Sequence, residues 1–262
     1  MSQPAMTKAD KKAKKNEFVE TVIVIVEALL IALVFRTFLY QPFSIPSASM
    51  QSTLMVGDYF LASKFTWGLG KYSFPIPLPF NGRILQLSQP QQGDVAVFHN
   101  GPTDQDFIKR IIGMPGDHIQ MKQGRLYING KMLDRQLVGQ GVDHTESGDF
   151  NVQVYNETLP NGVVHPIQEQ SDTEALDNTD EYVVPAGHYF MMGDNRDDSS
   201  DSRVLSEVGY VPADNLIGKA EVRFFSIKDN QPPWAFWTWP TSIRWDRMFQ
   251  SVYQPYTTTP AP

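Results

Sequence analysis

The longest hydrophobic stretch of the chain lies near its N-terminus. Of the 22 residues from Val19 to Tyr40, 17 are apolar. Coiled as a helix, this stretch would be about 33 Å long, which matches the roughly 30 Å hydrocarbon core of a bilayer. The pattern predicts a transmembrane helix over residues 18–40. No second stretch of comparable length and apolarity follows.

The charges before this stretch indicate its orientation. Five lysines precede it, namely Lys8, Lys11, Lys12, Lys14 and Lys15. Because positively charged flanks stay in the cytoplasm, the remaining ~220 residues are predicted to lie across the membrane. A cleaved secretory signal is the alternative. Against it, the apolar stretch is long, and the small residues beyond it (Ser47, Ala48, Ser49) lie nearly fifty positions into the chain.

Beyond residue 41 the pattern changes to short segments rich in valine, isoleucine, phenylalanine and tyrosine, bounded by glycine, proline, asparagine or aspartate. Segments of this kind are typical of β-strands, and Asn129-Gly130 between two of them predicts a tight hairpin turn. No long amphipathic helical period follows, so the fold is predicted to be mainly antiparallel β. The predicted strands are Asp94–Phe98, Phe107–Ile112, Arg125–Ile128, Glu181–Val184, His188–Met192 and Gly218–Phe225.

Composition excludes several classes of protein. The net charge is −7, and because the first fifteen residues carry +4, the rest of the chain carries −11. A body this acidic has no electrostatic footprint for nucleic acid. The absence of cysteine excludes a cysteine nucleophile, a thiolate metal site and disulfides. The acidic run Asp194–Asp201 lacks the ligand pattern of a calcium loop, and the five histidines show no metal spacing, so no metal or cofactor is expected.

The acidic charge is concentrated in one segment. Gln136–Asn195 contains no lysine or arginine but eleven acidic residues. We interpret it as the solvent-facing part of an inserted subdomain, whose charge keeps it away from anionic lipid. The predicted division is a cytoplasmic basic tail (1–17), the transmembrane helix (18–40), a β domain in two parts (41–120 and 186–256), an inserted acidic β subdomain (121–185) and a flexible tail (257–262).

The C-terminal region is rich in tryptophan. Four of the five tryptophans, Trp234, Trp237, Trp239 and Trp245, lie within twelve residues. Tryptophan favours the membrane–water interface, because its ring and its N–H suit different surroundings. The segment is therefore predicted either to rest on the bilayer or to supply ordinary core aromatics.

Common enzyme signatures are absent from the chain. There is no Gly-x-Ser-x-Gly, His-Glu-x-x-His or phosphate-loop motif. What remains is a serine-rich segment just beyond the anchor, Gln41–Met50, and a lysine inside an apolar strand, Lys109. Strand alternation places Phe107 and Lys109 on one face. Taken alone, Lys109 would be interpreted as a lysine protecting a sheet edge.

Together these segments resemble bacterial type I signal peptidase (leader peptidase), a membrane-anchored Ser/Lys endopeptidase. Four blocks carry the resemblance in the order and spacing of that family: Ile45–Asp58, Gly93–Phe98, Phe107–Asp117 and Met192–Arg203. The resemblance implies that the β domain is the catalytic domain. The implied substrates are secretory precursors with Ala-x-Ala cleavage sites.

The resemblance also implies roles for individual residues. Ser49 would be the nucleophile and Lys109 its general base. Ser47 would lend a hydroxyl to the oxyanion hole beside the Ser49 backbone N–H, and Ser199 would orient the Lys109 amine. The supporting residues would be Asp201 and Arg203 as an ion pair, with Asp194 and Asn195 shaping the same loop.

Two positions depart from the family pattern. Ala48 stands where the family usually has glycine, and Ser52 where it usually has proline. A methyl group at Ala48 requires ordinary backbone dihedrals there. These departures bear on the geometry of the oxyanion hole and not on the pair formed by Ser49 and Lys109.

A lysine can act as a base only where its pKa is lowered. An unperturbed pKa near 10.4 leaves roughly one amine in 2,500 neutral at pH 7, and lowering it to about 7 costs around 4.6 kcal/mol. Burial among apolar groups shifts a lysine by about 3–5 pKa units. Lys109, between phenylalanine and isoleucine residues, has a suitable setting for a base.

The position of the serine predicts where the reaction occurs. Ser49 lies nine residues beyond Tyr40, so it is expected close to the outer leaflet of a bacterial cytoplasmic (inner) membrane, in a single-pass protein with its catalytic domain on the periplasmic side. The substrate is expected to bind as an extended strand. Candidates for the walls of its pockets are Met50, Leu54, Val97 and Phe98. Expected partners are the precursors, membrane lipid and, transiently, the secretion machinery, but no nucleic acid.

Three other interpretations stay open at this point. One is a dedicated Ser/Lys processing protease with a narrow substrate range. Another is a self-cleaving repressor-type protein, against which the anchor and the lack of a DNA-binding motif argue. The third is a non-catalytic anchored β module that binds envelope partners.

Overall fold

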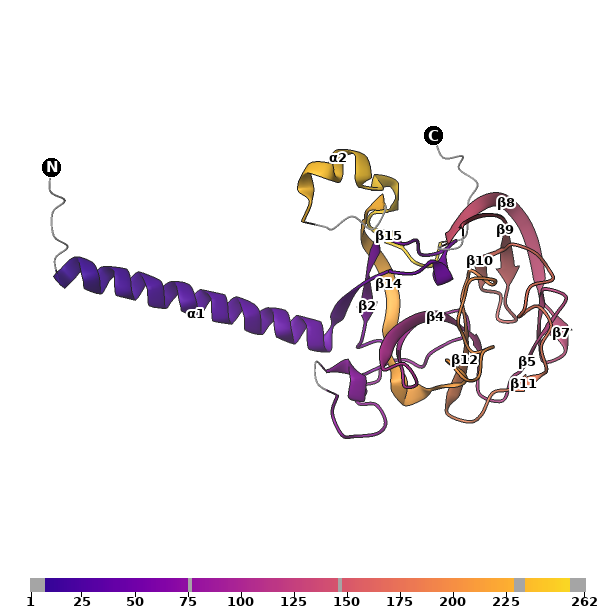
Figure 1. The fold of residues 1–262 in the computed structure, drawn as a ribbon. Coiled ribbons are helices and arrows are strands. Elements are labelled where there is room, and N and C mark those ends of the chain that lie inside the picture. The colour runs from indigo at the N-terminus through magenta and orange to yellow at the C-terminus, as the bar shows by residue number, and fades with distance from the viewer. Residues whose placement is uncertain (1–7, 75–76, 146–147, 229–233, 255–262) are drawn as a thin grey trace.

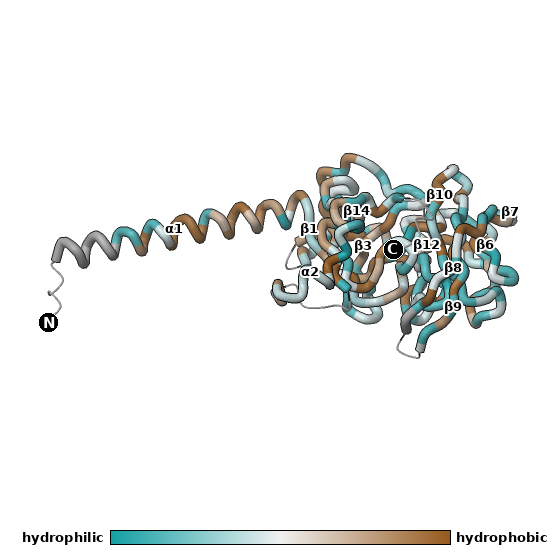
Figure 2. The backbone as a smooth tube through the Cα atoms, turned by 90° about the horizontal axis from the view of Figure 1, so that it is seen from above, coloured by the Kyte–Doolittle hydropathy of each residue, from teal (hydrophilic) through white to brown (hydrophobic). Residues whose placement is uncertain are grey.

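The computed structural model describes residues 8–74, 77–145, 148–228 and 234–254. Figure 1 shows one long helix, α1 (Lys8–Phe38), that projects from a body made mostly of strands. Its part from Asn16 to Phe38 is long and apolar enough to cross a membrane, and its most apolar stretch is not buried against the rest of the chain. Near its end, where the helix meets the body, Thr37 is buried. The hydropathy colours of Figure 2 show this apolar part beside the body. The predicted apolar helix is confirmed.

The helix differs from the prediction at both ends. It begins at Lys8, within the segment predicted to be a tail, because lysine and alanine are strong helix formers. It ends at Phe38, and the chain enters its first strand at Tyr40. The predicted flexible tail, 257–262, lies outside the described residues.

An eight-stranded antiparallel sheet forms the larger part of the body, as the sequence predicts. Its strands follow the order β1-β2-β14-β3-β4-β12-β13, and β15 pairs with β14. The turn that carries Ser49 follows β1, and Lys109 lies on β4. The bounds are β1 (Tyr40–Ser44), β2 (Asp58–Ser63), β3 (Val95–Asn100), β4 (Gln105–Gly113), β12 (His188–Met192), β13 (Val211–Pro212), β14 (Leu216–Ser226) and β15 (Gln250–Ser251).

Two smaller antiparallel sheets complete the described strands. One has the order β10-β9-β8, and the other β11-β5-β6-β7. The predicted hairpin turn is confirmed: Asn129 and Gly130 join β6 to β7, both with positive φ. The bounds are β5 (His118–Lys122), β6 (Arg125–Ile128), β7 (Lys131–Met132), β8 (Asp134–Thr145), β9 (Gly148–Thr158), β10 (Val164–Glu169) and β11 (Tyr182–Val183). The division into an inserted unit at 121–185 stays a prediction.

Helices beyond α1 are short in the described part of the chain. They are the 3-10 turns η1 (Ala48–Met50), η2 (Lys71–Ser73), η3 (Ala213–Asn215), η5 (Phe236–Thr238) and η6 (Trp245–Arg247), and the one-turn helix α2 (Trp239–Ser242).

The interpretation of Gln136–Asn195 as solvent-facing is wrong for nearly half of its acidic residues. Five of the eleven are buried, namely Asp143, Glu157, Glu169, Asp177 and Asp194. Three of these carboxylates pair with arginines that lie outside the segment. The charge excess along the sequence is therefore partly neutralised in three dimensions, which a count within one segment cannot reveal.

Candidate active site

Ser49 is held on a buried turn at the edge of the hydrophobic core. It lies in η1, and Ile45 and Met50 on either side are fully buried in the core that includes β2, β3 and β14. The Ser49 carbonyl accepts a hydrogen bond from the Asn195 N–H at 3.1 Å, and the Ala48 carbonyl accepts one from the Asn195 side-chain amide at 3.3 Å. Core packing and a distant loop therefore fix the serine together.

Lys109 approaches Ser49 from β4. Its Nζ lies 2.5 Å from the Ser49 Oγ, although sixty residues separate the two in the chain. On the same strand, the Phe107 ring lies 5.9 Å from the ammonium position, which confirms that these two side chains share a face. The lysine is only 4% exposed. Water therefore has little access to the amine.

Burial changes the acid–base chemistry of this lysine. Loss of hydration lowers the pKa of Lys109 to about 8, with the nearby Asp201 acting in the opposite direction and Arg203 adding to the decrease. At pH 7 about one amine in ten is then neutral. A neutral amine in contact with a hydroxyl can take its proton and so turn the oxygen into a nucleophile.

Ser47 and Ser199 lie beside this pair. The Ser47 Oγ is 3.3 Å from the Ser49 Oγ. The Ser199 hydroxyl is buried and has no hydrogen-bond partner within the described residues. Gly193 explains how closely these parts pack: a Cβ added there would lie 2.5 Å from the Ser49 carbonyl oxygen and against the Ser199 side chain. Only glycine allows this approach.

Asp201 and Arg203 form a fully buried ion pair behind the loop. The Arg203 Nη2 lies 2.8 Å from the Asp201 Oδ2, and that oxygen also accepts a hydrogen bond from the Gly193 N–H at 3.0 Å. Burial alone would raise the pKa of Asp201, but the Arg203 guanidinium and the Gly193 N–H outweigh it and lower this pKa. The ion pair therefore anchors the glycine that packs against Ser49.

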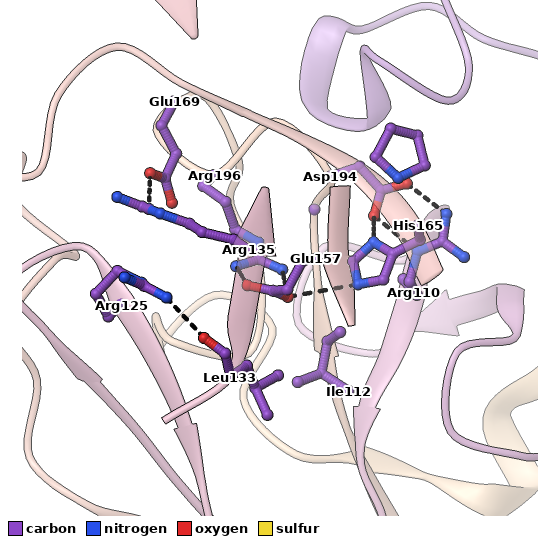
Figure 3. A network of polar contacts seen from close by, with 12 residues as sticks. Arg110, Ile112, Arg125, Leu133, Arg135, Glu157, His165, Glu169, Asp194 and Arg196 are labelled. Atoms are coloured by element: carbon purple, nitrogen blue, oxygen red, sulfur yellow. Dashed lines mark hydrogen bonds and ion pairs between the residues drawn. The ribbon is translucent and has the colours of Figure 1, made fainter. Parts of the chain in front are cut away.

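A second set of buried charges surrounds Asp194 and Glu157, as Figure 3 shows. Arg110 donates to both oxygens of Asp194, at 2.8 and 2.6 Å. His165 lies 3.5 Å from Asp194 and 3.4 Å from Glu157, and Glu157 pairs with Arg196. The Arg110 guanidinium outweighs burial and lowers the pKa of Asp194. Asp194 thus carries a firm negative charge one residue before Asn195.

Thr53 joins this cluster to the serine turn. Its hydroxyl donates to the Asp194 Oδ2 at 2.5 Å and accepts from the Arg110 Nη2 at 3.2 Å. Sequence reasoning missed both Thr53 and Arg110. A signal was available, since Arg110 is a charged residue inside an apolar strand and such a residue needs a buried partner.

A cleft of about 450 Å³ opens at the Ser49–Lys109 pair. Besides these two residues, its walls include Phe43, Ser47, Val97, Phe107 and Ile108. Of the four predicted wall residues, Val97 lines this cleft, whereas Met50, Leu54 and Phe98 are not among its lining residues. All three are fully buried in hydrophobic clusters. Among the described residues, no group of acidic or histidine side chains is arranged to hold a metal.

The site holds a buried serine hydroxyl in contact with a lysine amine, on a β body attached to an apolar helix. This arrangement is typical of a membrane-anchored serine peptidase. Comparisons with known proteins agree. Residues 18–225 match the family model described as signal peptidase, peptidase S26. The chain belongs to this signal peptidase family, whose members are serine endopeptidases.

Named relatives cover nearly the whole chain. The signal peptidase I of Rickettsia akari is 37% identical over 268 residues, which span 92% of this chain and 94% of the relative. That of Rickettsia conorii is 38% identical over 251 residues, spanning 86% and 90%. A crystal structure of a signal peptidase I from Enterococcus faecalis is 28% identical, covers 51% of this chain and 98% of its own, and aligns with a TM-score of 0.30.

Proposed function

We propose that this peptidase removes N-terminal signal peptides from secreted precursor proteins, with Ser49 as the nucleophile and Lys109 as its general base. The 2.5 Å contact between the Ser49 Oγ and the Nζ of a buried lysine carries the proposal. The family and the named relatives support signal peptides as the substrate.

In the first step, the Ser49 hydroxyl donates its proton to the neutral Lys109 amine while its oxygen bonds to the carbonyl carbon of the cleaved peptide bond. The resulting ammonium gives the proton to the departing amine, and an ester to Ser49 remains. Water then attacks the ester, again losing a proton to Lys109, and the serine hydroxyl is regenerated. No other proton carrier is needed.

The oxyanion is proposed to lie between the Ser47 hydroxyl and the Ser49 backbone N–H, which together contribute several kcal/mol. Alanine at position 48 fits, because the backbone there does not take a positive φ. Ser52 has a φ of 86°, which a proline cannot adopt, so the backbone follows a different path there from one containing proline. Ser199, with its unpartnered buried hydroxyl, is the proposed group that orients Lys109.

Cleavage of several unrelated precursors by the full-length enzyme in detergent tests this function. We expect each precursor to be shortened after an Ala-x-Ala sequence, as measured by mass spectrometry of both products. Cleavage of one precursor only would favour the dedicated processing protease. No cleavage of any, together with no labelling of Ser49 by a serine acylator, would favour the non-catalytic binding module.

The pH dependence of the reaction follows from the lowered pKa of Lys109. Because the base must be neutral, kcat/KM is expected to fall about tenfold per pH unit below about pH 8 and to level off above it. Initial rates on a fluorogenic peptide between pH 5 and about 10 measure this limb. A limb near the ordinary lysine value would contradict the buried-amine mechanism.

The tryptophan-rich segment supports a position against the membrane. Trp234, Trp237 and Trp245 are 70%, 64% and 63% exposed, which excludes the core alternative for these three rings. Figure 1 shows α2, within this segment, on the side of the body from which α1 projects. We propose that the segment rests on the outer leaflet and holds the cleft close to emerging signal peptides.

Tryptophan fluorescence tests this placement in the full chain reconstituted into vesicles. Lipids brominated near the headgroup are expected to quench a large part of the emission, because three exposed rings lie within their reach. Replacing Trp234, Trp237, Trp239 and Trp245 by phenylalanine is expected to remove most of the quenching, since the remaining tryptophan, Trp67, is fully buried in the body. Equal quenching of the wild type and the variant would contradict the placement.

A further inference from the structure

The small sheet β10-β9-β8 reaches over the turn that carries Ser49. In Figure 1 the long strand β8 arches from the far end of the body to this turn. Two side-chain contacts join them directly: Gln51 donates to the Val142 carbonyl at 3.5 Å, and Ser52 donates to the Pro166 carbonyl at 3.2 Å. A third contact is indirect, because Asp143 of β8 accepts a hydrogen bond from Asn195, which itself contacts the turn. The sheet therefore contacts the residues that follow the nucleophile directly, and it reaches Ala48, which precedes the nucleophile, through Asn195.

Asp143 differs from the other buried carboxylates at the site. Asp194, Asp201 and Glu157 each pair with an arginine, whereas Asp143 forms no ion pair within the described residues, although its side chain is 0% exposed. Its Oδ2 accepts a hydrogen bond from the Asn195 side chain at 2.6 Å, and its Oδ1 has no hydrogen-bond partner in the described part. A carboxylate buried in this way is costly unless its single contact is specific.

The hydrogen bond between Asp143 and Asn195 determines the orientation of the Asn195 side-chain amide. A carboxylate only accepts hydrogen bonds, so the NH₂ end of the amide must face Asp143 and not the oxygen end. The same NH₂ group also donates to the Ala48 carbonyl at 3.3 Å, while the Asn195 backbone N–H donates to the Ser49 carbonyl. Asp143 thus selects the amide orientation in which Asn195 donates hydrogen bonds to both the Ala48 and the Ser49 carbonyls.

We propose that Asp143 is a positioning residue for peptide cleavage. It acts through Asn195 to hold the Ala48 and Ser49 carbonyls, so that the Ser49 hydroxyl stays in contact with Lys109. This inference rests on the proposed role of Ser49 as the nucleophile. It assigns to the sheet β10-β9-β8 a part in catalysis, although none of its described residues lines the cleft.

Replacing Asp143 by alanine in the full-length enzyme is expected to lower kcat about tenfold to a hundredfold on a fluorogenic peptide with an Ala-x-Ala site, because small displacements of a nucleophile are that costly. KM is expected to change little, since Asp143 does not line the cleft. Asp143→Asn, which keeps an acceptor oxygen, should recover most of the loss. The matched control is Asp134→Ala, an exposed residue of the same strand, and it should behave as the wild type.

A double-mutant cycle separates positioning from simple stabilisation. In an Asn195→Ala background, Asp143→Ala is expected to have no further effect on kcat, because its effect passes through Asn195. Additive effects would overturn the inference, as would a lower melting temperature with unchanged kcat. If Asp143→Ala does not fold, Asp143→Ser gives the same cycle, since the shorter side chain does not reach Asn195.

The Ser49→Ala variant distinguishes a failure of the proposed function from a failure of the positioning role of Asp143. If that variant is inactive while Asp143→Ala retains wild-type kcat, only the inference about Asp143 fails. If Ser49→Ala itself retains activity, the proposed function fails first.

Discussion

Replacing Lys109 by methionine is expected to lower kcat/KM for precursor cleavage by about 10⁴-fold, which is the upper range for the loss of a general base. Methionine has a similar length and is apolar, so it fits the buried space beside Phe107. It leaves the Ser49 hydroxyl without a group to take its proton. The measurement is the initial rate of cleavage of a full-length precursor in detergent, at equal enzyme concentrations.

Lys131→Met is the matched control, because Lys131 is an exposed lysine on the short strand β7. It should cleave at the wild-type rate. Ser49→Ala should be as inactive as Lys109→Met, and the double variant no worse than either, since residues that act as one unit lose their effect together. Activity of Lys109→Met within tenfold of the wild type would exclude Lys109 as the base.

The second large effect concerns stability. Arg110→Met is expected to lower the free energy of unfolding by about 3–5 kcal/mol, because it leaves the Asp194 carboxylate buried without its partner. Both side chains are only 1% exposed, and Arg110 also donates to the Gly93 carbonyl at 2.8 Å. Urea unfolding followed by near-ultraviolet circular dichroism measures this difference.

The double variant Arg110→Met with Asp194→Leu is expected to recover much of this loss, since two apolar side chains replace the ion pair and no charge stays buried alone. Arg125→Met serves as a control for the loss of an arginine at a half-buried site, where the guanidinium donates to the Leu133 carbonyl. A loss below about 1 kcal/mol for Arg110→Met would contradict the importance of this ion pair.

The sequence predicts much of the fold because its strongest patterns are local. The apolar helix, the Asn129-Gly130 turn and strands such as Arg125–Ile128 depend on neighbouring residues alone, and the structure contains each of them. The start of α1 does not follow from the apolar pattern, because the lysines before the apolar stretch also favour a helix and extend it to Lys8.

The candidate site is predictable in part. Ser49 and Lys109 are recognisable from the segments around them, but their contact depends on the pairing of strands far apart in the chain. The same limit applies to Met50 and Phe98, which are apolar like Val97 but do not line the cleft, because strand pairing and not hydrophobicity alone decides which side chains face it. The sequence does not single out Asp143 among the acids of its segment, because its side-chain partner in the described part of the chain, Asn195, lies 52 residues away.

The short strand β1 fixes the distance between the end of α1 and the turn that carries Ser49. It begins two residues after α1 ends and pairs with β2 through five successive residues, from Tyr40 opposite Ser63 to Ser44 opposite Tyr59. A strand held in such register cannot slide without turning its side chains to the wrong face. With α1 in the bilayer as proposed, the distance between the lipid surface and Ser49 is therefore fixed. We expect efficient cleavage only of precursors in which the spacing between the hydrophobic segment and the cleavage site matches this distance.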